Sequence, residues 1–150
     1  MNEHEHIAVI TCQKCHHKAE FELHDVIDSK DNAYEKNRIL NGTLFEHKCH
    51  NCNTNIDLLY ETVYCDVDRN TMIYLVHEGN FDATNSMLHT IAAIERKYPD
   101  AYASTPKPKK RIVTCHHKLR EKVLILEEGL DDRIIEIIKI ICVNYQSPEG

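Results

Sequence analysis

Two matched pairs of cysteines constrain this chain more than any other feature. Cys12 and Cys15 are separated by two residues, and Cys49 and Cys52 repeat that spacing further along. Two intervening residues let a tight turn hold both sulfurs along one edge of a tetrahedron, so two such turns complete a Zn–S₄ shell. Because four protein ligands leave no position for water, the spacing predicts one structural Zn²⁺ ion held by Cys12, Cys15, Cys49 and Cys52.

Other uses of the same residues stay open at this point. One CxxC pair can be a redox site, but such a pair belongs at the start of a helix in a βαβ unit, and the doubled motif favours a metal. Replacement of one sulfur by His16 or His50 would give a Cys₃His site. An iron–sulfur cluster also accepts four cysteines.

Composition narrows the class of protein. With 18 Lys and Arg against 24 Asp and Glu, the chain has a formal charge of −6 and lacks the basic balance of a nucleic-acid binder. No window of 18 uncharged apolar residues occurs, and the first residues lack the basic and apolar regions of a signal peptide. We therefore expect a cytoplasmic protein with no membrane contact, in which cysteines are thiols or metal ligands rather than disulfides.

The residues around the first cysteine pair predict a β-hairpin. Residues 7–11 are apolar and mostly β-branched, and residues 18–24 alternate polar with apolar side chains, as a half-buried strand does. Two strands on either side of a CxxC turn would form a zinc knuckle. Between the two cysteine pairs, Asp28 and Ser29 favour the start of a short helix, and Asn41-Gly42 favours its end.

The middle of the chain predicts further strands. A strand over residues 44–49 would deliver Cys49, and residues 56–67 and 71–78 would form a hairpin. Residues 84–97 fit a helix, whereas residues 99–110 carry three of the four prolines and are typical of a linker.

After a short strand beginning at Arg111, the sequence predicts two helices around Gly129. The first has an apolar stripe with steps of four, three and four residues. Its members are Leu119, Val123, Leu126 and Leu130. The second helix would be capped by Asp131 or Asp132, because a carboxylate accepts backbone N–H bonds at a helix start.

This second helix is unusually apolar. Arg133, Glu136 and Lys139 share one narrow side, while isoleucines fill most of the rest. Such a helix is not expected on a surface, so we expect it in the core or in an interface with another subunit of a homo-oligomer. Cys142 within it is expected to be a small core residue.

Three longer segments resemble one known family. They are GTLFEHKCHNC at 42–52, VYCDVDRNTMIYLV at 63–76 and RIVTCHHKLREKVLILEEGLDDRIIEIIK at 111–139. These segments resemble the CpXC domain family, which is named for two Cys-Pro-x-Cys motifs. The resemblance implies one domain over residues 1–150 that binds zinc through Cys12, Cys15, Cys49 and Cys52, and it supplies no activity.

The chain departs from the family pattern at two positions. Gln13 and His50 stand where the motifs have proline. Proline stiffens such a turn but supplies no ligand, so the change bears on rigidity more than on metal binding.

Two other groups of residues have side chains suited to chemistry. Cys115-His116-His117 places a thiol beside two imidazoles, which suits a nucleophile or a second metal site. Neighbours in sequence rarely face each other, however, so a turn or helix start is the simpler interpretation. Tyr64, Asp66 and Asp68 alternate along a strand and could serve acid–base chemistry, but they run into a typical turn.

The sequence thus predicts an α+β fold. A zinc-ribbon or knuckle-like β-sheet from residues 7–78 would be followed by a helix and Pro-rich linker over 79–110, and by helices over 111–145 packed on the sheet. The leading hypothesis for function is a zinc-stabilised, non-enzymatic module that binds a protein partner. Nucleic-acid binding by the basic stretch 107–122 is the alternative, and an enzyme using Cys115 is a third.

Overall fold

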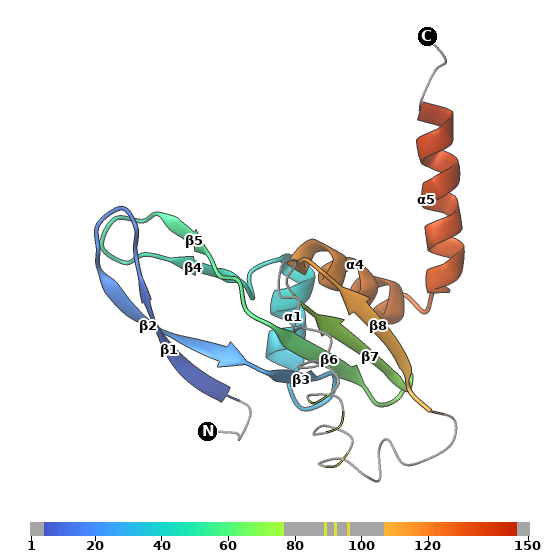
Figure 1. Ribbon diagram of the computed structural model, residues 1–150, viewed down its shortest axis with the longest axis horizontal. Helices are drawn as coiled ribbons and strands as arrows, with labels where there is room; N and C mark the ends of the chain where they lie inside the picture. The colour runs from blue at the N-terminus through green and yellow to red at the C-terminus, as the bar shows by residue number, and fades with distance from the viewer. Residues whose placement is uncertain (1–4, 77–88, 90–91, 93–95, 97–106, 147–150) are drawn as a thin grey trace.

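The computed structural model describes residues 5–76, 89, 92, 96 and 107–146 (Figure 1). In this part of the chain, strands and helices combine in an α+β fold, as predicted. The strands are β1 (Glu5–Thr11), β2 (Lys18–His24), β3 (Val26–Asp28), β4 (Glu46–Lys48), β5 (Asn55–Asp57), β6 (Thr62–Asp66), β7 (Thr71–Leu75) and β8 (Lys109–Val113). The helices are α1 (Ala33–Asn41), α4 (His116–Glu127) and α5 (Asp132–Gln146).

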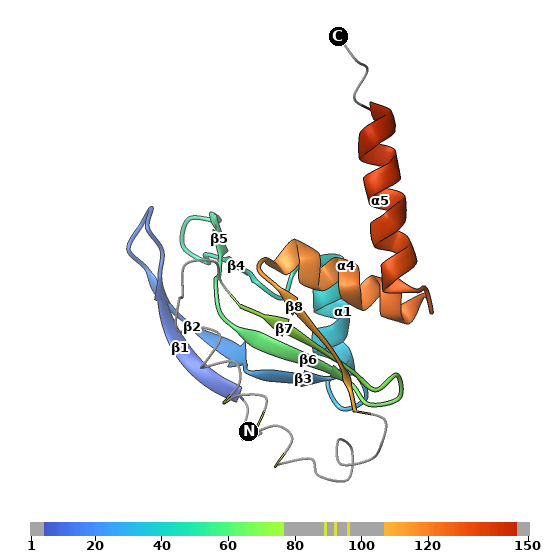
Figure 2. The same cartoon turned by 45° about the vertical axis from the view of Figure 1, so that its right-hand side comes forward.

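Four of the strands form two antiparallel hairpins, which we call the ribbon. β1 pairs with β2 from Glu5 opposite His24 to Thr11 opposite Lys18. β4 also pairs antiparallel with β5. The two hairpins lie side by side at one end of the molecule (Figures 1 and 2). Each hairpin encloses one CxxC turn, so the ribbon has the two-knuckle arrangement that the sequence predicts.

The other four strands form the main sheet, in the order β3-β6-β7-β8. The β6–β7 hairpin is antiparallel, as predicted. The sequence prediction missed β3, which pairs parallel with β6, and the continuous strand expected over 56–67 is instead two strands in different sheets. β8 pairs parallel with β7, with Thr71 opposite Lys109. All residues of the two central strands, β6 and β7, are buried, because buried apolar clusters lie on both faces of the sheet.

The main hydrophobic core lies between the main sheet and helices α1 and α4. Tyr64, Ile73 and Leu75 point to this side of the sheet, because alternate strand residues share a face. They belong to a buried cluster with Ile27, Ile39, Leu44, Phe45, Val113, Leu119 and Val123. The intervening strand residues, including Val63 and Cys65, belong to a second buried cluster.

A charged network joins α1, the β6–β7 turn and α4. The carboxylate of Asp66 is fully buried and accepts bonds from the Arg69 backbone N–H (3.0 Å) and guanidinium (2.7 Å). The same guanidinium lies 3.5 Å from Glu127, which also pairs with Lys36 at 3.1 Å. A buried carboxylate needs such partners, so Asp66 has a structural role in this turn.

The apolar side of α4 is close to the predicted stripe. Leu119 and Val123 are fully buried, and Leu126 packs against the core. The prediction that Leu130 belongs to this stripe is wrong. The helix ends at Glu127, and Leu130, which follows Gly129, is 51% exposed. Gly129 has a φ of 66°, a left-handed conformation that ends helices readily.

Helix α5 extends away from the rest of the molecule (Figures 1 and 2). Its predicted cap is confirmed, since Asp131 Oδ1 accepts the Arg133 N–H at 2.9 Å. The expectation that this helix enters the core is wrong for the single chain, because five of its six isoleucines are exposed. Cys142 is likewise exposed instead of buried. Asp132, Glu136 and Lys139 form ion pairs with α4, and these pairs orient the apolar side outward.

Two predicted segments fall largely outside the described residues. These are the helix over 84–97 and the linker over 99–110. In the part of the chain that is described, no helix has the length and apolar character needed to cross a membrane.

Candidate metal centre

The first CxxC turn is closed by backbone hydrogen bonds. The N–H of His16 donates to the carbonyl of Cys12 (2.8 Å), and the N–H of Cys12 donates to the carbonyl of His17 (2.9 Å). His16 adopts a φ of 57°, which lets the chain reverse and return as β2. Gln13, which stands at the proline position of the motif, takes no part in these bonds.

The second turn repeats the first. Asn53 donates to the Cys49 carbonyl (2.8 Å), and Cys49 donates to the Thr54 carbonyl (2.9 Å). Asn53 also has a φ of 57°. Two turns of the same geometry, each four residues from the first cysteine to the left-handed residue, therefore present their sulfurs in the same way. Asparagine favours this conformation, so Asn53 was a signal available in the sequence.

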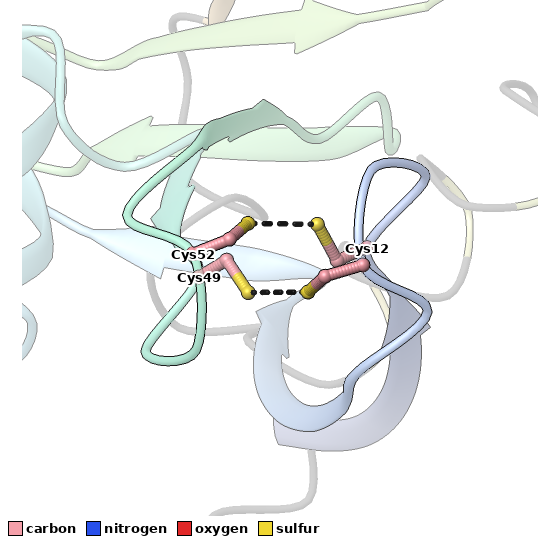
Figure 3. A group of neighbouring side chains, drawn as sticks. Cys12, Cys49 and Cys52 are labelled. Atoms are coloured by element: carbon pink, nitrogen blue, oxygen red, sulfur yellow. Dashed lines mark hydrogen bonds between the residues drawn. The ribbon is translucent and has the colours of Figure 1, made fainter.

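The turns bring the four predicted cysteines into one cluster (Figure 3). Cys12 Sγ lies 3.6 Å from Cys52 Sγ, and Cys15 Sγ lies 3.6 Å from Cys49 Sγ. All four sulfurs lie within 4.8 Å of one another. A tetrahedral site with metal–sulfur bonds of about 2.3 Å has sulfur–sulfur edges of about 3.8 Å. The arrangement could therefore hold one metal ion at its centre.

The cysteine thiols differ in pKa because their surroundings differ. The Thr54 hydroxyl, 3.2 Å from Cys52 Sγ, and the Thr54 backbone N–H stabilise the thiolate and lower the pKa of Cys52 to about 6. The backbone N–H of Cys52 also stabilises the Cys49 thiolate, but desolvation and the nearby sulfurs outweigh it and raise the pKa of Cys49 to about 11. Four adjacent thiols cannot all ionise without a cation, whereas a divalent metal would favour all four thiolates.

The two histidines that could replace a sulfur ligand, His16 and His50, lie outside this cluster. Among the described residues, the group of close ligand atoms contains the four cysteines and neither His16 nor His50. The ring of His50 instead packs edge-on against His47, with centroids 5.7 Å apart. His47 in turn lies edge-on to Phe21 at 6.0 Å.

The Cys115-His116-His117 segment stands at the start of α4. Cys115 is the N-cap residue, with an extended backbone, and its carbonyl accepts the N–H of Leu119 at 3.1 Å. The His116 ring stacks on Phe45 with centroids 5.8 Å apart and lies 4.1 Å from the ring of His117. The segment is thus a helix start beside the core, as the simpler interpretation has it.

The basic stretch 107–122 is partly neutralised within the chain. Arg111 Nε donates to Asp132 at 2.9 Å, and Lys122 pairs with both Asp132 and Glu136. Hydrogen bonding by Lys122 and Arg111 outweighs desolvation and lowers the pKa of Asp132. These cations hold the corner between α4 and α5.

A family model described as CpXC protein matches residues 10–139. The chain belongs to the CpXC protein family. The match includes both cysteine pairs, the main sheet, α4 and the first half of α5. The family match therefore includes the metal centre and the core together. No curated protein and no solved structure matches the chain.

Proposed function

We propose that this CpXC domain is a zinc-stabilised, non-enzymatic module that acts by binding another protein. The observation that carries the proposal is the closed set of four sulfurs. Four thiolates in tetrahedral arrangement suit Zn²⁺, and they occupy every position around it. With no position left for water or substrate, the ion would hold the two hairpins together and do no chemistry.

The weak packing of the ribbon supports a structural role for the metal. Of the described side chains in β1, β2, β4 and β5, only Phe21 and His24 are buried. Two-stranded sheets of this kind are marginal in water without further support. A structural zinc site contributes on the order of 10–16 kcal/mol, which is enough to replace the missing apolar core.

The exposed apolar surface of α5 supports a protein partner. Five of its six isoleucines are exposed in the single chain, and contiguous apolar patches on a protein surface often mark interaction sites. Nucleic acid is the weaker alternative, because Arg111 and Lys122 are already paired with Asp132. Enzymatic use of Cys115 is weaker still, because His116 stacks on Phe45 beside the core.

Elemental analysis of the purified chain tests the metal. We expect one zinc per chain, and zinc well below that level for Cys52→Ala, since loss of even an outer partner of a ligand costs roughly 10–100-fold in affinity. Cys142→Ala, which removes an exposed cysteine on α5, should keep full zinc. A metal-free chain that is fully folded would contradict the zinc site.

The mode of action is tested by purifying the native protein at physiological salt and identifying the molecules that co-purify with it. Recovery of a stoichiometric protein partner is expected. Catalytic turnover that disappears in Cys115→Ala would overturn the non-enzymatic part. An affinity for RNA or DNA that falls steeply with salt, and is lost on changing Lys109 and Lys110 to Glu, would favour the alternative.

A further inference from the structure

The side of the main sheet that faces α4 changes character along β8. Val113 lies opposite Leu75, and both belong to the main hydrophobic core. Alternate strand residues share a face, so Arg111 and Lys109 point to the same side as Val113. A strand that faces a core normally has apolar side chains at such positions. Two cations therefore stand where the core would be expected to continue.

A cavity of about 610 Å³ lies beyond the end of this core. It is placed between β7 and β8 on one side and the corner where α4 meets α5 on the other; Figure 2 shows the position of these elements. Its apolar lining comes from Ile73 of β7, from Ile125 and Leu126 of α4, and from Leu130 after that helix. Pockets that hold small organic molecules have volumes of about 300–1,000 Å³ and mostly apolar walls. The cavity is therefore large enough for such a ligand.

The charged lining of the cavity is mainly cationic. Among the described residues that line it, the acidic ones are Asp131 and Asp132, and the basic ones are Arg69, Lys109, Arg111, Lys122 and Arg133. Carboxylates neutralise four of these five cations. Asp132 binds Arg111 and Lys122, Asp131 binds Arg133, Asp66 and Glu127 bind Arg69, and Glu136 also binds Lys122. The fifth, Lys109, has no ion pair within the part of the chain that the structure describes.

Two neighbouring cations keep hydrogen-bond donors for a ligand. Arg111 uses Nε for Asp132 (2.9 Å) and Nη1 for the Lys110 carbonyl (3.1 Å). Its third nitrogen, Nη2, has no partner among the described residues. The ammonium group of Lys109 is free as well, and the two side chains are neighbours on one face of β8. A guanidinium and an ammonium so placed suit an oxyanion.

A purely structural role explains only part of this arrangement. Ion pairs with the start of α5 account for Arg111 and Lys122 as supports of the helix corner. They account neither for Lys109 nor for the open space between its strand and α4. An apolar wall on one side and spare cationic donors on the other are the features of a site for a molecule with an apolar part and an anionic group.

We propose that this cavity binds a small organic anion in which a phosphate group is carried on an apolar chain. The phosphate lies between Lys109 Nζ and Arg111 Nη2, and the chain lies against Ile125, Leu126 and Leu130. Phosphate suits these donors better than a carboxylate does, because it has three strong acceptor oxygens and carries more charge near pH 7. This site goes beyond the proposed function, since it uses neither the four sulfurs nor a protein partner.

An NMR titration of the full, zinc-loaded chain with hexyl phosphate at physiological salt tests the proposal. We expect saturable shifts of the backbone amide signals of Ile73, Arg111 and Leu126 at millimolar concentration or below. Inorganic phosphate and hexanol, which are the two halves of this probe, should each bind about tenfold more weakly or worse, because each makes only part of the contacts.

Two charge substitutions with matched controls locate the ligand. Lys109→Glu should weaken the binding of hexyl phosphate about tenfold or more, because it replaces a charge-assisted bond with repulsion. Lys110→Glu makes the same change of charge at the next position, on the other face of β8, and should bind as the wild type does. Leu130→Glu should weaken binding about tenfold as well, whereas Leu124→Glu, at a leucine that is 48% exposed outside the lining, should not.

The same spectra separate loss of the site from loss of the fold. Amide signals of the ribbon and of β6 should be unchanged in all four variants. An absence of saturable shifts with hexyl phosphate would overturn the proposal, as would equal affinities of the Lys109→Glu and Lys110→Glu variants. Hexanol that binds as tightly as hexyl phosphate would overturn the anionic part. Shifts confined to the exposed isoleucines of α5 would place the probe on that helix and overturn the assignment to the cavity.

Discussion

At the scale of single residues, the backbone after each cysteine pair explains how the metal centre forms without the motif prolines. The hydrogen bonds that close the first turn join Cys12, His16 and His17 and do not involve Gln13. The same holds for His50 in the second turn. Proline would stiffen these turns, but the left-handed residues His16 and Asn53 make the chain reversal.

Substitution of Asn53 tests this account. Asn53→Val should destabilise the zinc-bound chain by about 1–2 kcal/mol, because a residue with a β-branched side chain resists the left-handed conformation. Asn53→Gly should be neutral or slightly stabilising, since glycine adopts that conformation freely. Denaturant unfolding at saturating zinc measures both. Equal stabilities for the valine and glycine variants would show that the turn does not depend on this conformation.

At the scale of elements, one carboxylate caps the start of α5. Asp131 accepts bonds from the guanidinium of Arg133 (2.8 Å) and from the Arg133 backbone N–H (2.9 Å). These bonds favour the ionised form and lower the pKa of Asp131 to about 2. A carboxyl group whose pKa is lowered by folding stabilises the fold above its unfolded pKa of about 3.9 and loses that contribution as the pH falls.

Acid titration should therefore loosen the first turn of α5. The loss is expected between about pH 4 and pH 2, as Asp131 takes up a proton. The amide NMR signals of Arg133 and Ile134 report on this turn separately from the ribbon, which acid also affects by protonating the thiolates. In Asp131→Asn the cap is kept without its titrating group, so the transition should become smaller, with the remainder due to Asp132, which also loses its bonds from Lys122 and Arg111 on protonation. If the transition is unchanged in Asp131→Asn, it arises from the protonation of another group.

At the scale of the whole molecule, the chain has two differently stabilised parts. The main sheet with α1 and α4 has a buried apolar cluster that includes Tyr64, Ile73 and Leu119. The ribbon has few buried side chains, and its two hairpins meet at the four sulfurs. The ribbon should therefore depend on the metal, and the main sheet on apolar burial.

Chelation of the metal should separate these two parts. Backbone amides of β1, β2, β4 and β5 are expected to exchange hydrogen rapidly, while those of β6 and β7 stay protected. Hydrogen exchange followed by mass spectrometry, with and without chelator, measures the difference by segment. Restored zinc should restore protection in the ribbon. Loss of protection across β6 and β7 to the same extent would mean that the metal supports the whole fold.

Local features could be predicted from the sequence because they depend on residues that are close together in the chain. The two CxxC turns, the β6–β7 hairpin, the end of α1 at Gly42 and the Asp131 cap all arise from contacts within a few positions. The α+β class followed from these elements. The sequence did not reveal β3 or its pairing, because three residues carry little periodicity and its partner β6 lies more than 30 positions further along.

The sequence by itself determined that four cysteines at two equal spacings would form two knuckles, since tetrahedral coordination needs that spacing. It also determined that α5 is a helix with one narrow polar side. Only the tertiary structure decided where that polar side points. Lys122 and Glu121 on α4 offer charged partners to Glu136 and Lys139, and pairing them leaves the isoleucines facing outward. Such pairing depends on the arrangement of whole helices in space, which hydrophobic periodicity along the chain does not specify.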